Sequence, residues 1–113
     1  MKVNVTDSDI NEGIQGSFCD CPVALALKRK GLIDVSVYPD HVNFIKLNAD
    51  KTMDWYDYTL PEEAQMFIQD YDDSGDDIDA YVIDFELTAL RNKQRVSIVD
   101  NVIQEINQDE ATI

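Results

Sequence analysis

The sequence has few cysteines and no long apolar run, and each shortage excludes a class of protein. Cys19 and Cys21 are its two cysteines. Two cysteines do not make a disulfide scaffold, and a bridge between residues this close is strained. No apolar run approaches the roughly 20 residues of a membrane-spanning helix, and the first residues lack the apolar centre of a signal peptide. We therefore expect a cytosolic protein in a reduced compartment.

The sequence also lacks the short motifs of common enzyme classes. It contains no phosphate-binding loop, no dinucleotide-binding glycine pattern, no G-x-S-x-G and no pair of metal-binding histidines. Its one histidine, His41, lies next to a turn and is typical of a surface residue rather than a general base. We predict that the protein is not an enzyme and uses no cofactor.

Two short patterns suggest a metal site, and both are incomplete. Cys19 and Cys21 supply half of a zinc site, but zinc needs four ligands and His41 is the only histidine. The segment 70–76 follows the first half of a calcium loop, D-x-D-x-S-G, but its twelfth position is Tyr81, where a bidentate glutamate belongs. We predict no specific metal site. Cys21 is interpreted as a small apolar residue at a helix entry, where the helix dipole could give its thiol some thiolate character.

Basic residues are missing from one long stretch, which concentrates the negative charge of the chain. Between Thr52 and Leu90 there is no lysine, arginine or histidine. Twelve of the 23 carboxylates lie there: Asp54, Asp57, Glu62, Glu63, Asp70, Asp72, Asp73, Asp76, Asp77, Asp79, Asp84 and Glu86. This third of the chain carries most of the formal net charge of -14. Unneutralised charge opposes compaction, so the stretch indicates either a solvating surface or a surface for a basic partner.

Hydrophobic residues make up 44% of the chain, which is enough for one folded domain rather than a disordered acidic tail. Alternation predicts strands over 2–6, 33–37, 42–47, 53–59 and 80–88, with a turn at 38–41. Thr6 and Asp9 predict a capped helical turn, and Pro22 begins a helix that stops at Gly31. We predict an α+β fold, in which helices pack on one face of an antiparallel sheet of three to five strands.

A second long helix is predicted to begin at 60–63, with Pro61 at its first position. Its apolar face comprises Ala64, Phe67, Ile68 and Tyr71, and an acidic loop follows over 72–79. In the strand before it, Trp55, Tyr56 and Tyr58 could anchor an interface, although at least one face of that strand must enter the core.

The end of the chain gives conflicting signals. The segment RVSIV is rich in β-branched residues, which favours a strand. However, Val99, Val102, Ile103 and Ile106 lie on one helical face. We predict a C-terminal helix over roughly 93–107, so that the single domain 1–113 comprises a core of residues 1–90 and a helical extension of residues 91–113. Its apolar stripe would pack either on the sheet or across a homodimer.

Several segments resemble a known group of proteins. Residues 3–31 combine a strand, an I-x-x-G turn, a Cys-Pro pair and an Ala/Leu-rich helix, and the segments DYTLPEEAQMFIQDYD and Phe85-Glu86-Leu87 follow. Over residues 1–88 the chain resembles small uncharacterised proteins of tailed-phage genomes. The resemblance implies a phage source, the host cytoplasm as location and the fold, but no reaction. The residues after Leu90 and the strongly acidic loop 72–79 depart from the group.

Two functions follow from charge and resemblance. The first is a phage-encoded acidic inhibitor of a host nucleic-acid-binding enzyme or defence complex, of anti-restriction or anti-CRISPR type, that mimics DNA. Duplex DNA carries about one charge per 1.7 Å of axis, so twelve carboxylates match roughly 20 Å of duplex. The predicted contact residues are Asp70, Asp72, Asp73, Asp76, Asp77 and Asp79, extended by Glu62 and Glu63.

The second function is a structural or oligomeric phage accessory domain, whose acidic loop only solvates it. In either case the charge disfavours direct binding to nucleic acid or to an anionic membrane. A homodimer is compatible with both functions.

Overall fold

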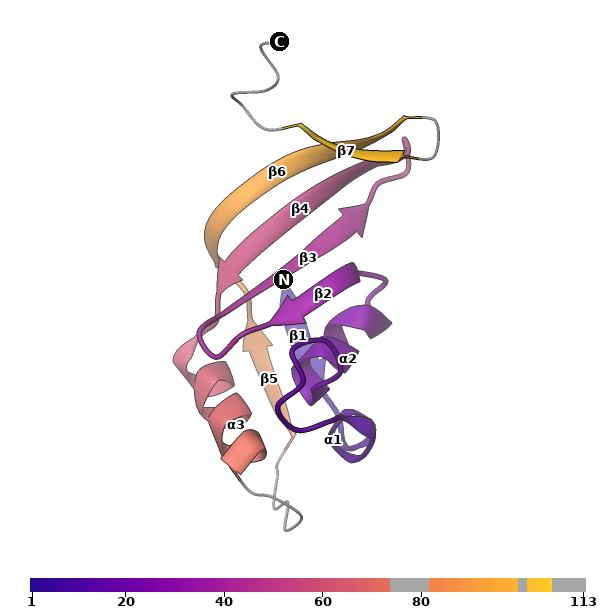
Figure 1. Ribbon diagram of the computed structural model, residues 1–113. Coiled ribbons are helices and arrows are strands. Elements are labelled where there is room, and N and C mark those ends of the chain that lie inside the picture. The colour runs from indigo at the N-terminus through magenta and orange to yellow at the C-terminus, as the bar shows by residue number, and fades with distance from the viewer. Residues whose placement is uncertain (74–81, 100–101, 107–113) are drawn as a thin grey trace.

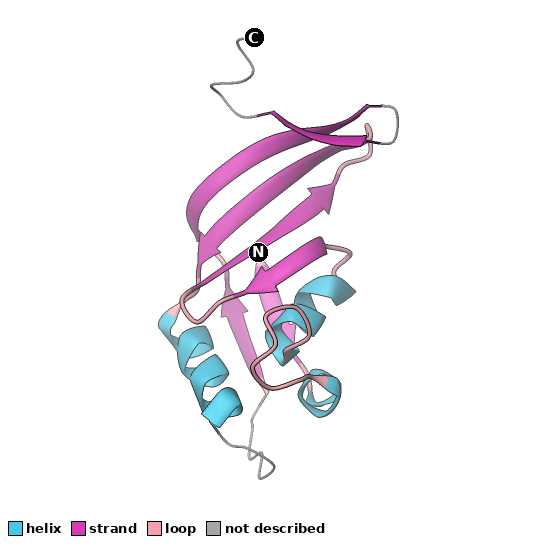
Figure 2. Ribbon diagram, viewed as in Figure 1, coloured by secondary structure: helices cyan, strands magenta, loops and turns pink. Residues whose placement is uncertain are grey.

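The computed structural model describes residues 1–73, 82–99 and 102–106, which form an α+β fold and confirm the predicted fold class (Figures 1 and 2). Helices and strands alternate irregularly along the chain, with strands predominating after the middle. The elements in chain order are β1 (Lys2–Val5), α1 (Asp7–Glu12), α2 (Pro22–Arg29), β2 (Ile33–Val37), β3 (His41–Leu47), β4 (Thr52–Thr59), α3 (Glu62–Asp73), β5 (Ile83–Glu86), β6 (Ala89–Val99) and β7 (Val102–Ile106).

Local sequence signals set the ends of the first two helices, as predicted. Thr6 caps α1: its hydroxyl accepts a hydrogen bond from the Asp9 amide at 3.3 Å, while the Asp9 carboxylate accepts one from the Thr6 amide at 2.9 Å. Helix α2 begins at Pro22, where a missing N–H has no cost. After α2, Gly31 has a φ of +89°, a left-handed conformation that glycine adopts without strain. These caps fix where the helices enter and leave the core.

The described strands form two antiparallel sheets. The main sheet has the order β2-β3-β4-β6-β7, and β1 pairs with β5 in a separate two-stranded sheet. In this pair Lys2 lies opposite Glu86 and Val5 opposite Ile83, so the two ends of the described core are joined directly. The strand predicted over 80–88 is therefore real but shorter, and residues 80 and 81 lie outside the described part.

The predicted C-terminal helix is wrong. Residues 89–99 form β6, which pairs with β4 along its length, and residues 102–106 form β7. Strand β4 pairs with β3 along one edge, and the backbone N–H and C=O groups along its other edge need partners. The β-branched segment RVSIV forms an extended strand whose backbone supplies these hydrogen bonds. Strand β6 lies between β4 and β7, so the main sheet continues past residue 90. The side chains of the apolar stripe lie outside the part of the structure that is described.

The core lies between one face of the main sheet and a layer made of α2, α3 and the β1–β5 pair. Val42 and Phe44 of β3 are fully buried in it, and Tyr56 and Tyr58 of β4 pack against it. The face of α3 predicted from its spacing is the buried one: Ala64, Phe67, Ile68 and Tyr71. Helix α3 begins at Glu62, one residue later than predicted.

The covering layer is shorter than the sheet. Figure 1 shows the three helices and the β1–β5 pair gathered at one end, whereas β3, β4 and β6 continue past them. We call the part of the sheet that continues past the helices the overhang, and define it by Ile45–Leu47 of β3, Thr52–Trp55 of β4 and Gln94–Arg95 of β6. Figure 2, which colours the helices cyan, shows no described helix beside the overhang in this view.

Tyr71 ties α3 to the turn after α1, and this contact is testable. Its buried hydroxyl donates to the carbonyl oxygens of Ile10 and Gly13, each at 3.0 Å. Tyr71→Phe should lower the free energy of unfolding by about 1–2 kcal/mol, because two buried acceptors lose a donor. Urea denaturation measures the change. Tyr38→Phe, at an exposed tyrosine, is the control and should stay within about 0.5 kcal/mol of the parent protein. Equal effects would contradict the structural role of the Tyr71 hydroxyl.

Candidate partner-binding surface

Helix α3 presents most of the predicted contact residues. Five of them lie on it and are exposed to solvent: Glu62, Glu63, Asp70, Asp72 and Asp73. The other three, Asp76, Asp77 and Asp79, lie outside the described residues. The acidic loop was predicted to begin at residue 72, but Asp72 and Asp73 belong to the helix. The reason is Tyr71, whose buried ring and hydroxyl contacts require the helical backbone to continue to this point.

Acidic residues lie at both ends of α3, and only one end favours them. Glu62 and Glu63 in the first turn face the positive end of the helix dipole. The last turn contains Asp70, Asp72 and Asp73 and no basic residue. Carboxylates there oppose the negative end of the dipole, each at a cost of about 0.3–1 kcal/mol. The stability of the helix therefore explains the acids at its beginning but not those at its end.

Asp72 has a structural contact that the sequence did not indicate. Its carboxylate accepts a hydrogen bond from the Gly16 amide at 2.9 Å, and Gln15 donates its side-chain amide to the Tyr71 carbonyl at 2.7 Å. The end of α3 is thus fastened to the loop between α1 and α2. By contrast, Glu62, Glu63 and Asp73 form no ion pair within the described ranges. These three carboxylates are exposed on α3 and have no neutralising cation in the described structure.

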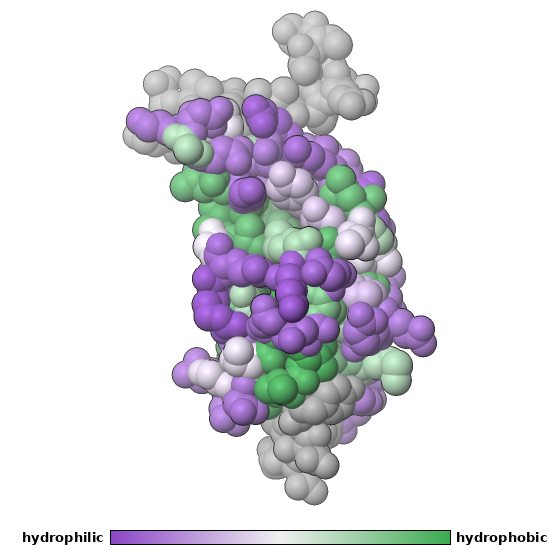
Figure 3. All heavy atoms as spheres, turned by 180° about the vertical axis from the view of Figure 1, so that it is seen from behind, coloured by the Kyte–Doolittle hydropathy of each residue, from purple (hydrophilic) through white to green (hydrophobic). Residues whose placement is uncertain are grey.

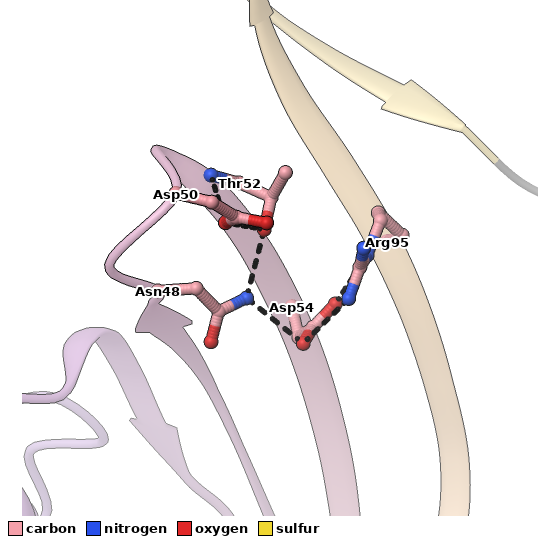
Figure 4. Close-up of polar contacts among 5 residues, drawn as sticks. All are labelled: Asn48, Asp50, Thr52, Asp54 and Arg95. Atoms are coloured by element: carbon pink, nitrogen blue, oxygen red, sulfur yellow. Dashed lines mark hydrogen bonds and ion pairs between the residues drawn. The ribbon is translucent and has the colours of Figure 1, made fainter.

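Asp54 belongs to the same acidic stretch but is an internal residue of the sheet. It is 4% exposed. Figure 4 shows its carboxylate between Arg95 of β6 and Asn48 of the β3–β4 turn. Arg95 donates to it from Nε at 3.0 Å and from Nη2 at 3.4 Å, and Asn48 donates at 3.0 Å. The Arg95 guanidinium, and then Asn48, hold the pKa of Asp54 below its usual range despite its burial. Asp54 is therefore charged and structurally committed, not presented to a partner.

Two further aspartates are neutralised by residues distant in the sequence. Arg91 of β6 lies with its Nε 3.7 Å from Oδ2 of Asp57. Asp9 is buried at the start of α1 and pairs with Arg29 at the end of α2. Burial acts to raise the pKa of Asp9, but hydrogen bonds from Arg29 and Thr6 outweigh it and hold the pKa below its usual range. Arg29 lies in the last turn of α2, where the helix dipole favours a cation, and it also neutralises this acid of α1.

The cysteines show no sign of reactivity in the described structure. Both are free thiols, and Cys21 is buried at the entry of α2. Burial raises the pKa of the Cys21 thiol, so the suggested thiolate character is wrong. No group of three or more His, Cys, Asp or Glu residues that could hold a metal occurs in the described parts. Asp70 and Asp72, the first positions of the partial calcium pattern, are helical.

An exposed aromatic stack was not predicted. The centroids of the Phe18 and Tyr38 rings lie 6.4 Å apart with the rings nearly parallel, and the His41 ring stacks on Tyr38 at 4.5 Å. The His41 Nδ1 also lies 2.6 Å from Oδ1 of Asp40, and the His41 side chain is 25% exposed. His41 is therefore half-buried rather than a free surface residue. The stack joins the loop before α2 to the β2–β3 turn, and no periodicity in the sequence links these positions.

A comparison of the chain with protein-family models, curated proteins and solved structures finds no match. Among the described helices, none is long and apolar enough to cross a membrane. Figure 3 shows the rear surface, where hydrophilic side chains form a band across the middle with hydrophobic areas above and below it. Polar groups are therefore distributed unevenly over this surface.

Arg95→Gln tests whether Asp54 depends on its ion pair. The substitution leaves a buried carboxylate without its main donor, so the free energy of unfolding should fall by about 1–3 kcal/mol. Lys46→Gln is the matched control, because Lys46 lies opposite Asp54 on β3 and is exposed, but forms no ion pair in the described structure. Chemical denaturation should show a clearly smaller loss for the control. Equal losses would mean that only the net charge matters.

The lowered pKa of Asp54 also sets a pH dependence. A carboxyl group whose pKa is lower in the folded state stabilises the fold above its unfolded pKa, about 3.9, and this contribution is lost as the pH falls through the folded value. The stability difference between the parent protein and Asp54→Asn should therefore be largest near neutral pH and shrink below about pH 4. Thermal melts between neutral and strongly acidic pH measure it. A constant difference would contradict the assignment.

Proposed function

We propose that this protein is a phage-encoded acidic inhibitor that binds the basic nucleic-acid surface of a host enzyme or defence complex in the host cytoplasm. Anti-restriction or anti-CRISPR activity would be a typical use of such an inhibitor. The proposal extends the resemblance to small phage proteins, and its main support is α3. Exposed carboxylates lie at both ends of this helix, and its twelve residues include no basic side chain. A basic partner would be attracted to such a surface at long range.

The spacing of the acids on α3 is compatible with DNA mimicry. Glu62 and Glu63 form one group, and Asp70 and Asp73 form the other. With a rise of 1.5 Å per residue, the two groups lie about 13 Å apart along the axis. The major groove of duplex DNA, which separates two rows of phosphates, is about 12 Å wide. A protein groove that contacts both phosphate rows could therefore contact both acidic groups.

The cost of the acids supports a role beyond solvation. A solvating residue can lie anywhere on the surface, whereas the last turn of a helix is a place where carboxylates are destabilising. Asp73 lies there exposed, with no ion pair in the described structure. Asp54 and Asp57 contribute little to this surface, because arginines of β6 neutralise them. The partner surface that we propose is thus smaller than the acidic stretch of the sequence.

A competition assay tests the proposal. Immobilised protein is incubated with a bacterial lysate, bound DNA-binding proteins are eluted with salt, and each is purified and loaded with a fluorescent DNA duplex. The protein should displace the duplex, and raising the salt from about 50 to 200 mM should weaken the displacement, since the contact is ionic. The triple variant Glu62→Gln/Glu63→Gln/Asp73→Asn should be at least about tenfold weaker, corresponding to about 1.4 kcal/mol.

The control variant removes the same charge elsewhere. Glu12→Gln/Asp34→Asn/Glu86→Gln neutralises three exposed acids outside α3. It should displace the duplex almost as well as the parent protein. If the control loses as much as the α3 variant, the effect is one of net charge and not of α3. If the parent protein displaces no duplex from any captured protein, DNA mimicry is contradicted and the structural alternative is favoured.

A further inference from the structure

The loop of residues 13–21, which connects α1 to α2, is bonded internally by its own polar groups. The Ser17 amide donates to the Ile14 carbonyl at 3.3 Å and closes a turn, and the Ile14 amide donates to the Asp20 carbonyl at 2.9 Å. The Ser17 hydroxyl accepts a hydrogen bond from the Asp20 amide at 3.0 Å. Gly16 lies inside this turn with a φ of +71°, which glycine adopts without strain. The backbone of the loop is therefore fixed from within.

The loop is also fastened to two elements that are distant in the sequence. Gln15 and Gly16 donate hydrogen bonds to the end of α3 at 2.7 and 2.9 Å. Further along, the Phe18 carbonyl accepts a hydrogen bond from the Val37 amide of β2 at 2.6 Å. Figure 1 shows the loop in front of α2. A loop that is fixed before a partner arrives loses little conformational entropy on binding, and such preorganisation strengthens binding.

This loop directs polar side chains inward and apolar side chains outward, which reverses the usual arrangement. Gln15 and Ser17 are half-buried. Ile14 and Phe18, on either side of the turn, are 57% and 56% exposed, and Tyr38, which stacks on Phe18, is 39% exposed. Single exposed apolar side chains are common, but here three lie on or against one fixed loop. We call Ile14, Phe18 and Tyr38 the loop patch.

The charges around the loop patch indicate the chemistry of its partner. Asp72 and Asp73 lie at the end of α3, which the loop contacts, and Asp40, whose side chain is 71% exposed, adjoins the stacked rings. None of these three pairs with a lysine or arginine among the described residues, whereas Asp20 of the loop pairs with Lys28 at 3.1 Å. The loop patch is therefore apolar and aromatic, with negative charge at its border.

This combination favours a basic occupant, and arginine in particular. A second copy of the chain is a poor occupant, because a two-fold axis would bring the same carboxylates together. The guanidinium group of arginine is planar and weakly hydrated, and it stacks on aromatic rings. The ammonium group of lysine is a compact charge that holds its water more strongly. A flat ring bordered by carboxylates therefore distinguishes the two cations, which carboxylates alone do not.

We propose that the loop patch binds a basic segment of a protein partner, in which an arginine guanidinium stacks on the Phe18 ring. Tyr38 supports this ring, and Ile14 contacts the apolar part of the same segment. The contact extends the proposed inhibitor function, on which it rests for the basic character of the partner. It adds a residue type that the partner must present and a second contact surface next to the end of α3.

Two blocked peptides test this contact: one of alternating arginine and glycine residues, and one with lysine in place of each arginine. In NMR titrations at low salt, the parent protein should bind the arginine peptide at least about threefold more tightly, with the largest shifts at the amides of residues 14–20 and 38. Phe18→Leu removes the ring but keeps an apolar side chain, so the ratio of the two affinities should fall to about one. Leu47→Ala, at an apolar side chain of the overhang that is also 56% exposed, is the control and should keep the parent ratio.

The ratio separates this contact from misfolding and from general charge attraction, because both would change the two affinities together. The triple variant of α3 should weaken both peptides alike and leave the ratio unchanged. Equal binding of the two peptides by the parent protein overturns the proposal, and so does a ratio that survives Phe18→Leu. Shifts that centre on Trp55 instead of the loop also overturn it. Because the ratio requires no displacement of DNA, its failure is distinct from a failure of the competition assay.

Discussion

The covering layer of this protein reaches only part of the way along its main sheet, and much of the structure follows from that limit. Where α2, α3 and the β1–β5 pair are present, β3 and β4 bury aromatic and aliphatic side chains beneath them. Beyond that layer, the side chains on the same faces of the sheet must contact water or one another. A sheet of alternating residues can meet this requirement by exchanging the roles of its two faces, and the overhang does so: Asp54 and Arg95 occupy the side that held Phe44 and Tyr56 one step earlier.

The same geometry explains how a strongly acidic chain folds. The sequence separates acids from bases, so that the middle third has no cation of its own. The antiparallel register of β4 and β6 brings Arg95 to Asp54, and Arg91 pairs with Asp57. Charges that are unbalanced along the chain are therefore partly balanced across it. Within the described part of the acidic stretch, most of the exposed acids lie on α3, and this makes α3 a better candidate contact surface than the composition alone indicated.

Signals between residues close in the sequence were sufficient for much of the fold. The Thr6 cap, the Pro22 helix start, the β2–β3 hairpin and the buried face of α3 all depend on neighbours within one or two turns. The end of the chain was mispredicted because its residues suit both a helix and a strand. The decision came from the open edge of β4, about forty residues earlier in the sequence. No local pattern contains that information.

The candidate surface, too, could be predicted only where it depends on residues close in the sequence. The exposure of the α3 acids follows from helical spacing, since the buried residues fix the opposite face. The contact of Asp72 with Gly16 could not be predicted, because it depends on how the loop before α2 lies against the end of α3. The two faces of β4 could be predicted only in part from the sequence. Trp55, Tyr56 and Tyr58 were recognised as possible anchors, but the register of three strands was needed to separate Trp55 from the two tyrosines.

The pairing of β1 with β5 has a consequence for how the protein is made. Val3 and Val5 leave the ribosome before their partners in β5, which come roughly eighty residues later in the chain. At translation rates of about 5–20 residues per second, β1 waits roughly 4–16 s for its partner. During that time its two valines, which are buried in the finished domain, stay in contact with water or with a chaperone. Closure of the core therefore waits for the synthesis of β5, and a nascent chain that stalls before residue 83 cannot complete it.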